Sequence, residues 1–380
     1  MASIKKYTKK DGSIAYQFQI YLGIDPLTGK KRFTTKRGFK SLQDAKIALN
    51  RLEYEVNTIG VPTSKPKIMT FKEISELWLE NYKLTVKEST FFTQSNAIKN
   101  HIYPNFAELK IDKITPDYCQ KIANKWHGYY KKFHNLIGLT EKIFDYAMTL
   151  KQITFNPMKS IVKPKKKDTL DKYEAPFYSK DELEIFLKTL EPYDMHYYMM
   201  FRLLAFTGLR KGELQALKWS DFQNGNIYVS RTLAKNAEGG EHFQTPKTKA
   251  SYREISIDHT TKLWLMKWRT EQKKRLLALG FNSNDDEQLI FSDEENNPFY
   301  LDYLNNFLKK FLKEHSLPKI TVHGFRHTHC SLLFEAGASI KEVQYRLGHS
   351  DIKTTMDIYA HVTKRAKNQT ADKFASYVNF

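Results

Sequence analysis

The stretch VHGFRHTHCSLLFEAG, residues 322–337, carries three histidines, one arginine and one cysteine within a few helical turns. His323 and Arg326 are three residues apart, so a helix places them on one face as two donors for an anion. Zinc is the alternative, because Cys330 follows on the same side, but zinc requires a fourth ligand and does not favour an arginine beside it. The pattern therefore favours an anion site on a helix, with the remaining histidines in supporting roles.

A second candidate site lies in TGLRKGELQALKW, residues 207–219. Arg210 follows a glycine break and starts a helix, and Glu213 lies one turn later on the same side. A guanidinium held at a helix start by a carboxylate can bind two phosphate oxygens, with help from the N–H groups of the helix. Alone, an Arg–Glu pair one turn apart is more typical of an exposed surface.

The third candidate is SIKEVQYRLGHSDIKTTMDIYAHV, residues 339–362. Its S-x-x-E start is a capping box, which predicts a helix that ends at Gly348. His349 is then expected in the turn, and Tyr359 follows ten residues later. A tyrosine at this place follows two arginines and two histidines that are able to hold a phosphate.

The net charge of +19 is unevenly distributed along the 380 residues. Residues 1–65 hold thirteen Lys or Arg against five Asp or Glu, and residues 66–172 hold nineteen against eleven. Residues 173–380 hold 29 against 26, which is close to neutral. Two basic segments before a near-neutral one indicate a protein whose first half binds a polyanion such as nucleic acid.

Composition disfavours two other classes of protein. Cys119 and Cys330 are the only cysteines, so we expect no disulfide framework and a reducing cytoplasm. No apolar run is long enough to cross a bilayer, and the first residues, MASIKKYTKK, lack the apolar stretch of a signal peptide. The sequence therefore predicts a cytoplasmic protein with no membrane partner.

Two polar segments, 61–67 and 163–175, divide the chain into three modules. Alternation in IAYQFQIYLG and the basic KRFTTKRGF predict strands, and Ser41 is positioned to cap a helix after them. We predict a three-stranded sheet plus helix over residues 1–62, a form that resembles sheet-based DNA readers. The apolar stripe of FKEISELWLENY and the helices predicted after it indicate a helical, DNA-binding module over residues 68–162.

Residues 175–380 are predicted to be mostly helical. MHYYMMFRLLAFTG is almost wholly apolar, which is typical of a central buried helix, and Gly208 would end it. NGNIYVSRTL and SYREISI predict a small antiparallel sheet, bridged by the polar AKNAEGGEHFQTPKTKA, with helices from there to about residue 361. The predicted fold class is α+β, mainly α with small β-sheets.

The motifs TGLRKGE, PKTKASYREI, HGFRHTH, LGHS and TTMDIYAHV resemble, in this order, the active-site motifs of the tyrosine recombinases. The similarity is greatest to integrases of phages and transposons, whose three-module layout also covers the whole chain. Each motif is short, but five in the correct order and spacing are specific. The family usually has leucine where Phe325 stands, an apolar exchange that leaves the chemistry unaffected. Carried over by position, the catalytic residues are Arg210, Lys247, His323, Arg326, His349 and Tyr359, with Glu213 and His327 supporting.

The resemblance implies a site-specific recombinase that needs no cofactor and no metal. Tyr359 would attack a DNA phosphorus and form a 3′-phosphotyrosine, while the two arginines hold the nonbridging oxygens. Lys247 would protonate the leaving 5′ oxygen, and Lys249 is the alternative lysine. His323 would act as a base on the tyrosine hydroxyl, and His349 would donate a hydrogen bond to the phosphate.

The resemblance also implies the partners. These are double-stranded DNA at core and arm attachment sites, further copies of the chain in a homotetrameric synaptic complex, and host DNA-bending or excision factors. Two other functions are compatible with parts of the pattern. A type IB topoisomerase-like relaxing enzyme uses the same tyrosine chemistry, although relaxation does not need two added DNA-binding modules. A non-catalytic DNA-binding regulator is the second, although the set of site residues is complete.

Overall fold

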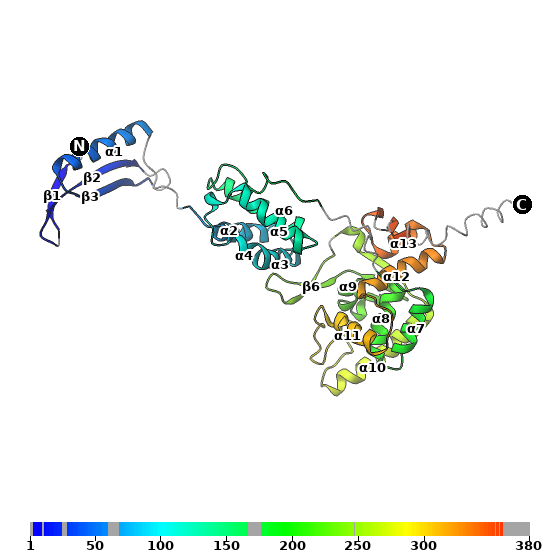
Figure 1. Ribbon diagram of the computed structural model, residues 1–380. Coiled ribbons are helices and arrows are strands. Elements are labelled where there is room, and N and C mark those ends of the chain that lie inside the picture. Colours follow the sequence, from blue (N-terminus) through cyan, green and yellow to red (C-terminus); the bar gives the residue numbers. More distant parts are fainter. Residues whose placement is uncertain are drawn as a thin grey trace, which may run out of the picture. The chain divides into compact units, whose positions relative to one another are not determined.

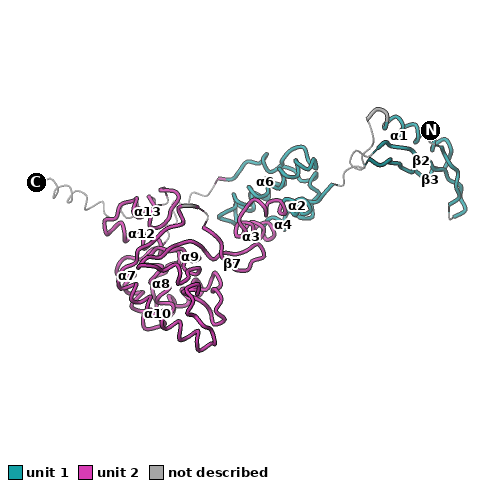
Figure 2. Tube along the Cα trace, turned by 180° about the vertical axis from the view of Figure 1, so that it is seen from behind, with its two compact units in different colours: residues 1–78, 101–164 teal, residues 79–100, 165–380 magenta. Residues whose placement is uncertain are grey.

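The structure is a computed structural model, and it describes residues 3–9, 11–24, 29–59, 68–165, 176–246, 248–353, 355–356 and 358–359. The chain forms two compact units, residues 1–78 with 101–164 and residues 79–100 with 165–380, which Figure 2 colours separately. The first predicted linker, most of the second, and the C-terminal residues 360–380 lie outside the described residues. The domain boundaries expected at these places therefore stay predictions.

The N-terminal segment is a three-stranded sheet with one helix, as the sequence predicted (Figure 1). Its strands pair antiparallel in the order β1-β2-β3. Phe18, Ile20 and Leu22 alternate along β2, and they are buried against Ala45 and Leu49 of α1. The sheet therefore has one covered face, which the helix closes. The elements are β1 (Ile4–Thr8), β2 (Ile14–Ile24), β3 (Lys31–Phe39) and α1 (Leu42–Ile59).

The next segment is helical, also as predicted. The side chain of Thr70 accepts a hydrogen bond from the backbone N–H of Glu73, and the backbone N–H of Thr70 donates to the Glu73 carboxylate, so a capping box starts the first of its helices. Phe71 packs against Phe106 and Phe144, with ring centroids 5.2 and 5.4 Å away, and these rings form a separate core. The elements are α2 (Phe71–Lys83), α3 (Glu88–Ala97), the π-helical Ile98–Ile102, α4 (Tyr103–Phe106), the 3-10 turn Ile111–Lys113, α5 (Pro116–Tyr129) and α6 (Phe133–Thr149).

The C-terminal unit is built around one central helix, α8 (Met195–Thr207), which contacts α7, α9, α10 and α12 (Figure 1). Phe201 of α8 packs with Phe186, Phe311 and Phe325, which are fully buried. This core explains why the helix is apolar on all sides. The surrounding helices are α7 (Lys180–Leu190), α9 (Lys211–Gln215), α10 (His259–Ala278), α11 (Tyr303–Glu314), α12 (Val322–Glu335) and α13 (Ile340–Leu347).

Two small antiparallel sheets accompany these helices. One has the order β4-β5-β8, and the other pairs β6 with β7. The pairing of β6 with β7 corrects the prediction of a bridging loop, because Asn236 Oδ1 accepts from the N–H groups of Glu238 and Gly240 and closes a tight turn. The strands are β4 (Phe222–Gln223), β5 (Asn226–Val229), β6 (Thr232–Lys235), β7 (Glu241–Gln244) and β8 (Arg253–Ser256), with 3-10 turns at Trp219–Asp221 and Lys249–Ser251.

A second correction concerns residues 279–302, which were expected to be helical but form turns and extended segments between α10 and α11. Gly280 has a φ of 87°, so it ends α10 in the left-handed region. Asp293 then accepts from the backbone of Glu295 and Asn297, which favours a turn over a helix. Among the described residues, none of the helices is both long and apolar enough to cross a membrane.

Candidate active site

The C-terminal end of α8 lies close to α12 and α13. Gly208 ends α8 with a φ of 66°, in the left-handed region that favours glycine. A Cβ atom at this position would lie 2.5 Å from Leu347 Cδ2 and 2.8 Å from His329 Cδ2. Because glycine has no side chain, three helices meet at this point, and Arg210 follows immediately before α9.

Glu213 holds Arg210 through two contacts. The backbone N–H of Arg210 donates to Glu213 Oε2 at 2.8 Å, and Arg210 Nη1 donates to Glu213 Oε1 at 2.8 Å. The side chain of Arg210 is 38% exposed, whereas that of Glu213 is 3% exposed. The guanidinium is therefore fixed at one edge and open on the rest, as the spacing of the two residues suggested.

Arg253 also binds Glu213, and the sequence reasoning did not single it out. Its Nη2 donates to Glu213 Oε2 at 2.8 Å and its Nη1 to Oε1 at 3.2 Å. Burial raises the pKa of Glu213, but the hydrogen bonds and charge of Arg253, together with Arg210, outweigh it and hold that pKa at about 2. A signal was present in the sequence, because an arginine on the buried face of a predicted strand needs a carboxylate partner.

Arg326 of α12 joins the ends of two other helices. Its Nη1 donates to the carbonyl oxygen of Gly208 at 2.7 Å, and its Nη2 donates to that of Leu347 at 2.6 Å. Arg326 is buried, and burial with the nearby charge of Arg210 lowers its pKa to about 9. Within the described part of the chain, Arg326 has no carboxylate within ion-pair distance. Among the described residues, this buried cation is bonded to two carbonyl oxygens and to no other group.

His323 lies one turn before Arg326 on α12, as its spacing predicted. Burial lowers its pKa to about 4, with further contributions from His327, Arg326 and Arg210. The rings of His323 and His327 meet edge to face at 4.9 Å. His323 is therefore neutral near pH 7 and able to accept a proton.

His349 stands in the turn after α13, where the sequence placed it. Gly348 ends the helix with a φ of 65°, and His349 Nδ1 lies 2.8 Å from Thr355 Oγ1. Burial, and then the charges of Arg326 and Arg210, lower the pKa of His349 to about 3. Arg253 acts on the pKa of His349 in the same direction, so His349 shares the neighbourhood of both predicted arginines and of Arg253.

Tyr359 is held by different contacts. Its ring meets that of Phe334 edge to face at 5.0 Å, and its side chain is 39% exposed. Phe334 lies about 12 Å further along α12 than Arg326, taking a rise of 1.5 Å per residue. Ile358, beside Tyr359, packs on a cluster formed by α12 and α13. The structure thus anchors the segment of Tyr359 on α12, which carries His323 and Arg326, and on α13, which precedes His349.

Known protein families match the three segments in order. The phage integrase family matches residues 176–366, its N-terminal SAM-like domain matches residues 70–127, and an arm DNA-binding domain matches residues 3–56. The integrase of Staphylococcus phage L54a is 30% identical over 339 residues, which cover 83% of this chain and 95% of the relative. The chain belongs to the phage integrase family.

Other relatives in the phage integrase family extend over most of the chain. The ICEBs1 integrase of Bacillus subtilis is 28% identical over 366 residues, 94% of this chain and 96% of the relative. The Tn1549 transposon integrase (residues 82–397), solved in complex with circular intermediate DNA, has a TM-score of 0.63 at 24% identity, over 79% of this chain and 99% of that one. A lambda integrase tetramer bound to a Holliday junction has a TM-score of 0.57 at 18% identity, over 93% and 94%. These structures establish the shared fold.

As a member of this family, the protein is a site-specific tyrosine recombinase of mobile elements, an enzyme that cleaves and transfers DNA strands. Family membership therefore favours recombination over the relaxing enzyme and the regulator. The recombinase lysine is the site residue that geometry does not address, because Lys247 lies outside the described residues. Lys249, the alternative lysine, begins a 3-10 turn.

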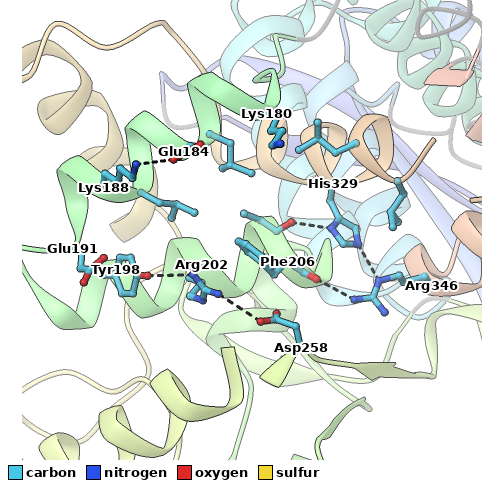
Figure 3. Close-up of a pocket in the computed structure, with 15 residues that line it drawn as sticks. Lys180, Glu184, Lys188, Glu191, Tyr198, Arg202, Phe206, Asp258, His329 and Arg346 are labelled. Atoms are coloured by element: carbon cyan, nitrogen blue, oxygen red, sulfur yellow. Dashed lines mark hydrogen bonds and ion pairs between the residues drawn. The ribbon is translucent and has the colours of Figure 1, made fainter. Parts of the chain in front are cut away.

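The remaining histidine of the integrase motif, His329, has two partners, which Figure 3 shows. Its Nδ1 donates to the carbonyl oxygen of Ala205 at 2.8 Å, and its Nε2 accepts from Arg346 Nε at 3.0 Å. Burial and the charge of Arg346 lower the pKa of His329 to about 3, in agreement with this neutral form. In the part of the chain that is described, no group of three or more His, Cys, Asp or Glu side chains is arranged to hold a metal ion.

A hollow of about 1310 Å³ lies beside Arg210 and His323 in this recombinase unit. Its lining residues are all described, and none of them is acidic. The charged residues that line the hollow are therefore all basic, although Arg210 is paired with Glu213 and Lys211 with Asp302. An excess of basic residues next to the predicted catalytic residues suits the binding of a nucleic-acid backbone. We call it the basic hollow, after its lysines Lys211, Lys309, Lys313 and Lys319.

Proposed function

We propose that Tyr359 cleaves one strand of an attachment site and carries it as a 3′-phosphotyrosine until the strand is rejoined. The observation that supports this most is the environment of Arg326, whose guanidinium is buried and bonded to two carbonyl oxygens. A buried cation without an anionic partner is costly, so the site lacks one negative charge. A DNA phosphate supplies that charge.

The arginines have donors left for this phosphate. A guanidinium has five N–H donors, and the carbonyl oxygens of Gly208 and Leu347 occupy two of those of Arg326. Arg210 keeps its exposed edge beyond the contact with Glu213. In the proposed mechanism the two guanidinium groups bind the nonbridging oxygens and stabilise the charge that builds up as phosphorus becomes five-coordinate.

In the cleavage step, one bond to phosphorus replaces another and two protons move. The hydroxyl oxygen of Tyr359 bonds to phosphorus while the bond from phosphorus to the 5′ oxygen breaks. His323 accepts the proton of the tyrosine, since its pKa of about 4 leaves it neutral near pH 7. Lys247 donates a proton to the 5′ oxygen, and His349, held by Thr355, donates a hydrogen bond to the phosphate. Rejoining reverses these steps with the 5′ hydroxyl of a new strand.

The three modules divide the recognition of DNA in this proposal. Residues 1–62 bind arm sites, residues 68–162 bind the core site, and residues 175–380 carry out cleavage. The excess of Lys and Arg over residues 1–172 is available to neutralise phosphates. The active assembly is a homotetramer on two DNA duplexes in the bacterial cytoplasm, and host DNA-bending or excision factors set its direction.

The test is covalent trapping on DNA of a suspected attachment site with a nick close to the cleavage position. The short fragment between the cleavage position and the nick, which bears the new 5′ hydroxyl, diffuses away and cannot be rejoined. The covalent protein–DNA adduct therefore accumulates as a band that resists detergent. Tyr359→Phe should remove this band and leave DNA affinity nearly unchanged, because only the nucleophilic oxygen is lost. An undiminished band from that variant would refute the assignment. Relaxation of plasmid without any attachment site would favour the topoisomerase-like function instead.

A further inference from the structure

Arg253 occupies a position that the chemistry alone does not require. It is the first residue of β8, where it pairs with Val229 of β5. Residues alternate between buried and exposed along β8, so Arg253 and Ile255 share the covered face of the sheet. The side chain of Arg253 has no exposed surface. A strand therefore delivers a guanidinium into the interior of the C-terminal unit.

The donors of Arg253 are distributed over three segments. Nη1 and Nη2 bind the two carboxylate oxygens of Glu213 in a forked contact, and Nη1 also donates to the carbonyl oxygen of Ser251 at 3.2 Å. Nε donates to the carbonyl oxygen of Arg346 at 2.9 Å. One planar group thus connects the carboxylate that holds Arg210 with the last turn of α13.

The turn that carries His349 rests on the same side chain. A Cβ atom at Gly348 would lie 2.9 Å from Arg253 Cδ and 2.7 Å from the carbonyl oxygen of Ala250. The turn after α13 therefore packs directly on the aliphatic part of Arg253 and on the backbone before β8. His349 is the next residue, so its position depends on this contact.

We propose that Arg253 is a positioning residue for DNA cleavage: it orients Arg210 through Glu213, and it orients His349 through the turn at Gly348. The proposal rests on the roles given above to Arg210 and His349. Arg253 does not touch the phosphate itself. It occupies both carboxylate oxygens of Glu213, so Glu213 holds Arg210 by one edge and leaves the rest of that guanidinium open.

The alternative is that Arg253 stabilises the fold and nothing more, since loss of one partner of a buried ion pair generally destabilises a protein. Arg202 provides the matched control. It is also a buried arginine of this unit, it lies 3.6 Å from Asp258, and it donates to Thr261 at 3.0 Å. No contact of Arg202 involves Glu213 or Arg210. Arg202→Met should therefore destabilise the protein without slowing cleavage by the folded protein.

The experiment measures the single-turnover rate of adduct formation on saturating nicked DNA, together with thermal unfolding and DNA affinity. Arg253→Met should slow cleavage by about a hundredfold, the effect of a misplaced oxyanion donor, with DNA affinity unchanged. Arg253→Lys keeps the charge but cannot bind both carboxylate oxygens at once, and it should cleave about tenfold faster than Arg253→Met. Cleavage by Arg253→Met at the wild-type rate, or an equal loss in Arg202→Met, would overturn the proposal.

A second measurement separates positioning from stability even if Arg253→Met folds poorly. Glu213→Gln and Arg253→Lys, alone and combined, form a double-mutant cycle on the cleavage rate. If Arg253 acts partly through Glu213, the combined variant loses less than the product of the two single losses, because the two substitutions share one route to Arg210. Losses that multiply would contradict the proposal. A wild-type protein that forms no adduct would refute the proposed function instead, so the two failures are distinguishable.

Discussion

The hollow of Figure 3 and the basic hollow lie in the same unit, yet the basic side chains at the two hollows differ in their partners. In the first, of about 600 Å³, Arg202 is bonded to Tyr198, Thr261 and Asp258, and Lys188 is paired with Glu184 at 2.6 Å. In the basic hollow no lining residue is acidic, and the neighbouring Arg326 has only carbonyl partners within the described residues.

Because Arg202 and Lys188 already have acidic partners, the first hollow is compatible with a structural role. The excess charge at the second calls for an anion from outside the protein. Charge pairing therefore separates an arginine that supports the fold from one that waits for substrate, although both are buried. Sequence position and burial alone do not separate them.

Substitution of the arginines is the most direct test of this difference between the two hollows. Arg326→Ala and Arg210→Ala should each slow adduct formation by about a hundredfold or more, because each removes a donor to the nonbridging oxygens. Single-turnover cleavage of nicked DNA at saturating protein measures the effect, with Arg202→Met from the paired hollow as the control. A wild-type rate for either alanine variant would show that the substituted guanidinium does not bind the reacting phosphate.

A smaller effect on the cleavage rate is expected for Lys247, which lies outside the described residues. Lys247→Ala should slow cleavage of ordinary DNA, and a substrate with sulfur in place of the bridging 5′ oxygen should restore the rate, since a thiolate leaves without a proton. The same comparison on Lys249→Ala decides between the two lysines. Rescue of Lys249→Ala in place of Lys247→Ala would transfer the role.

The pH dependence should be weaker than that of an ordinary histidine site. The pKa of His323 in the free protein is about 4, so this base stays neutral above pH 5 and becomes protonated only below it. The kcat/KM for cleavage should therefore change less than about twofold between pH 6 and 8, and fall as the pH drops toward 4. A decline that begins near pH 6.5 would show that burial and the surrounding positive charge do not depress this pKa.

The smallest effect on cleavage is expected from the most remote basic segment. Removing residues 1–65 should leave adduct formation on an isolated core site within about twofold of wild type. It should abolish recombination that depends on arm sites and reduce the salt dependence of binding to arm DNA, because fewer phosphates are neutralised. If the N-terminal sheet instead covers part of the helical module, the truncated protein will aggregate and core cleavage will disappear as well.

Local patterns made much of this molecule predictable. The capping box at Ser339 starts a helix as expected, because the pattern encodes its own hydrogen bonds, and the same pattern starts helices at Thr70 and Ser179. The pairing of Arg210 with Glu213 follows in the same way from one turn of helix. The ordered motifs also identified the family, although each of them is short.

What the sequence did not predict depends on distant contacts. The segment Glu241–Gln244 is polar, and its sequence favours a loop. Only its pairing with Thr232–Lys235 makes it a strand. Arg253 and Glu213 are forty positions apart, and no spacing rule joins a strand residue to a helix residue over that length. The capture of the Gly208 and Leu347 carbonyl oxygens by Arg326 has the same origin.

The bond between His349 and Thr355 has a consequence for the length of the chain after it. Thr355 and Tyr359 are both helical, and the two positions are four residues apart, which is about one helical turn. The bond at Thr355 therefore also fixes the direction in which the side chain of Tyr359 leaves the helix. One residue inserted between Ile358 and Tyr359 would rotate the ring by about 100° around the helix axis. The number of residues between Thr355 and Tyr359 therefore sets the direction of the tyrosine ring around the helix axis. This segment should accept substitutions far more readily than insertions or deletions.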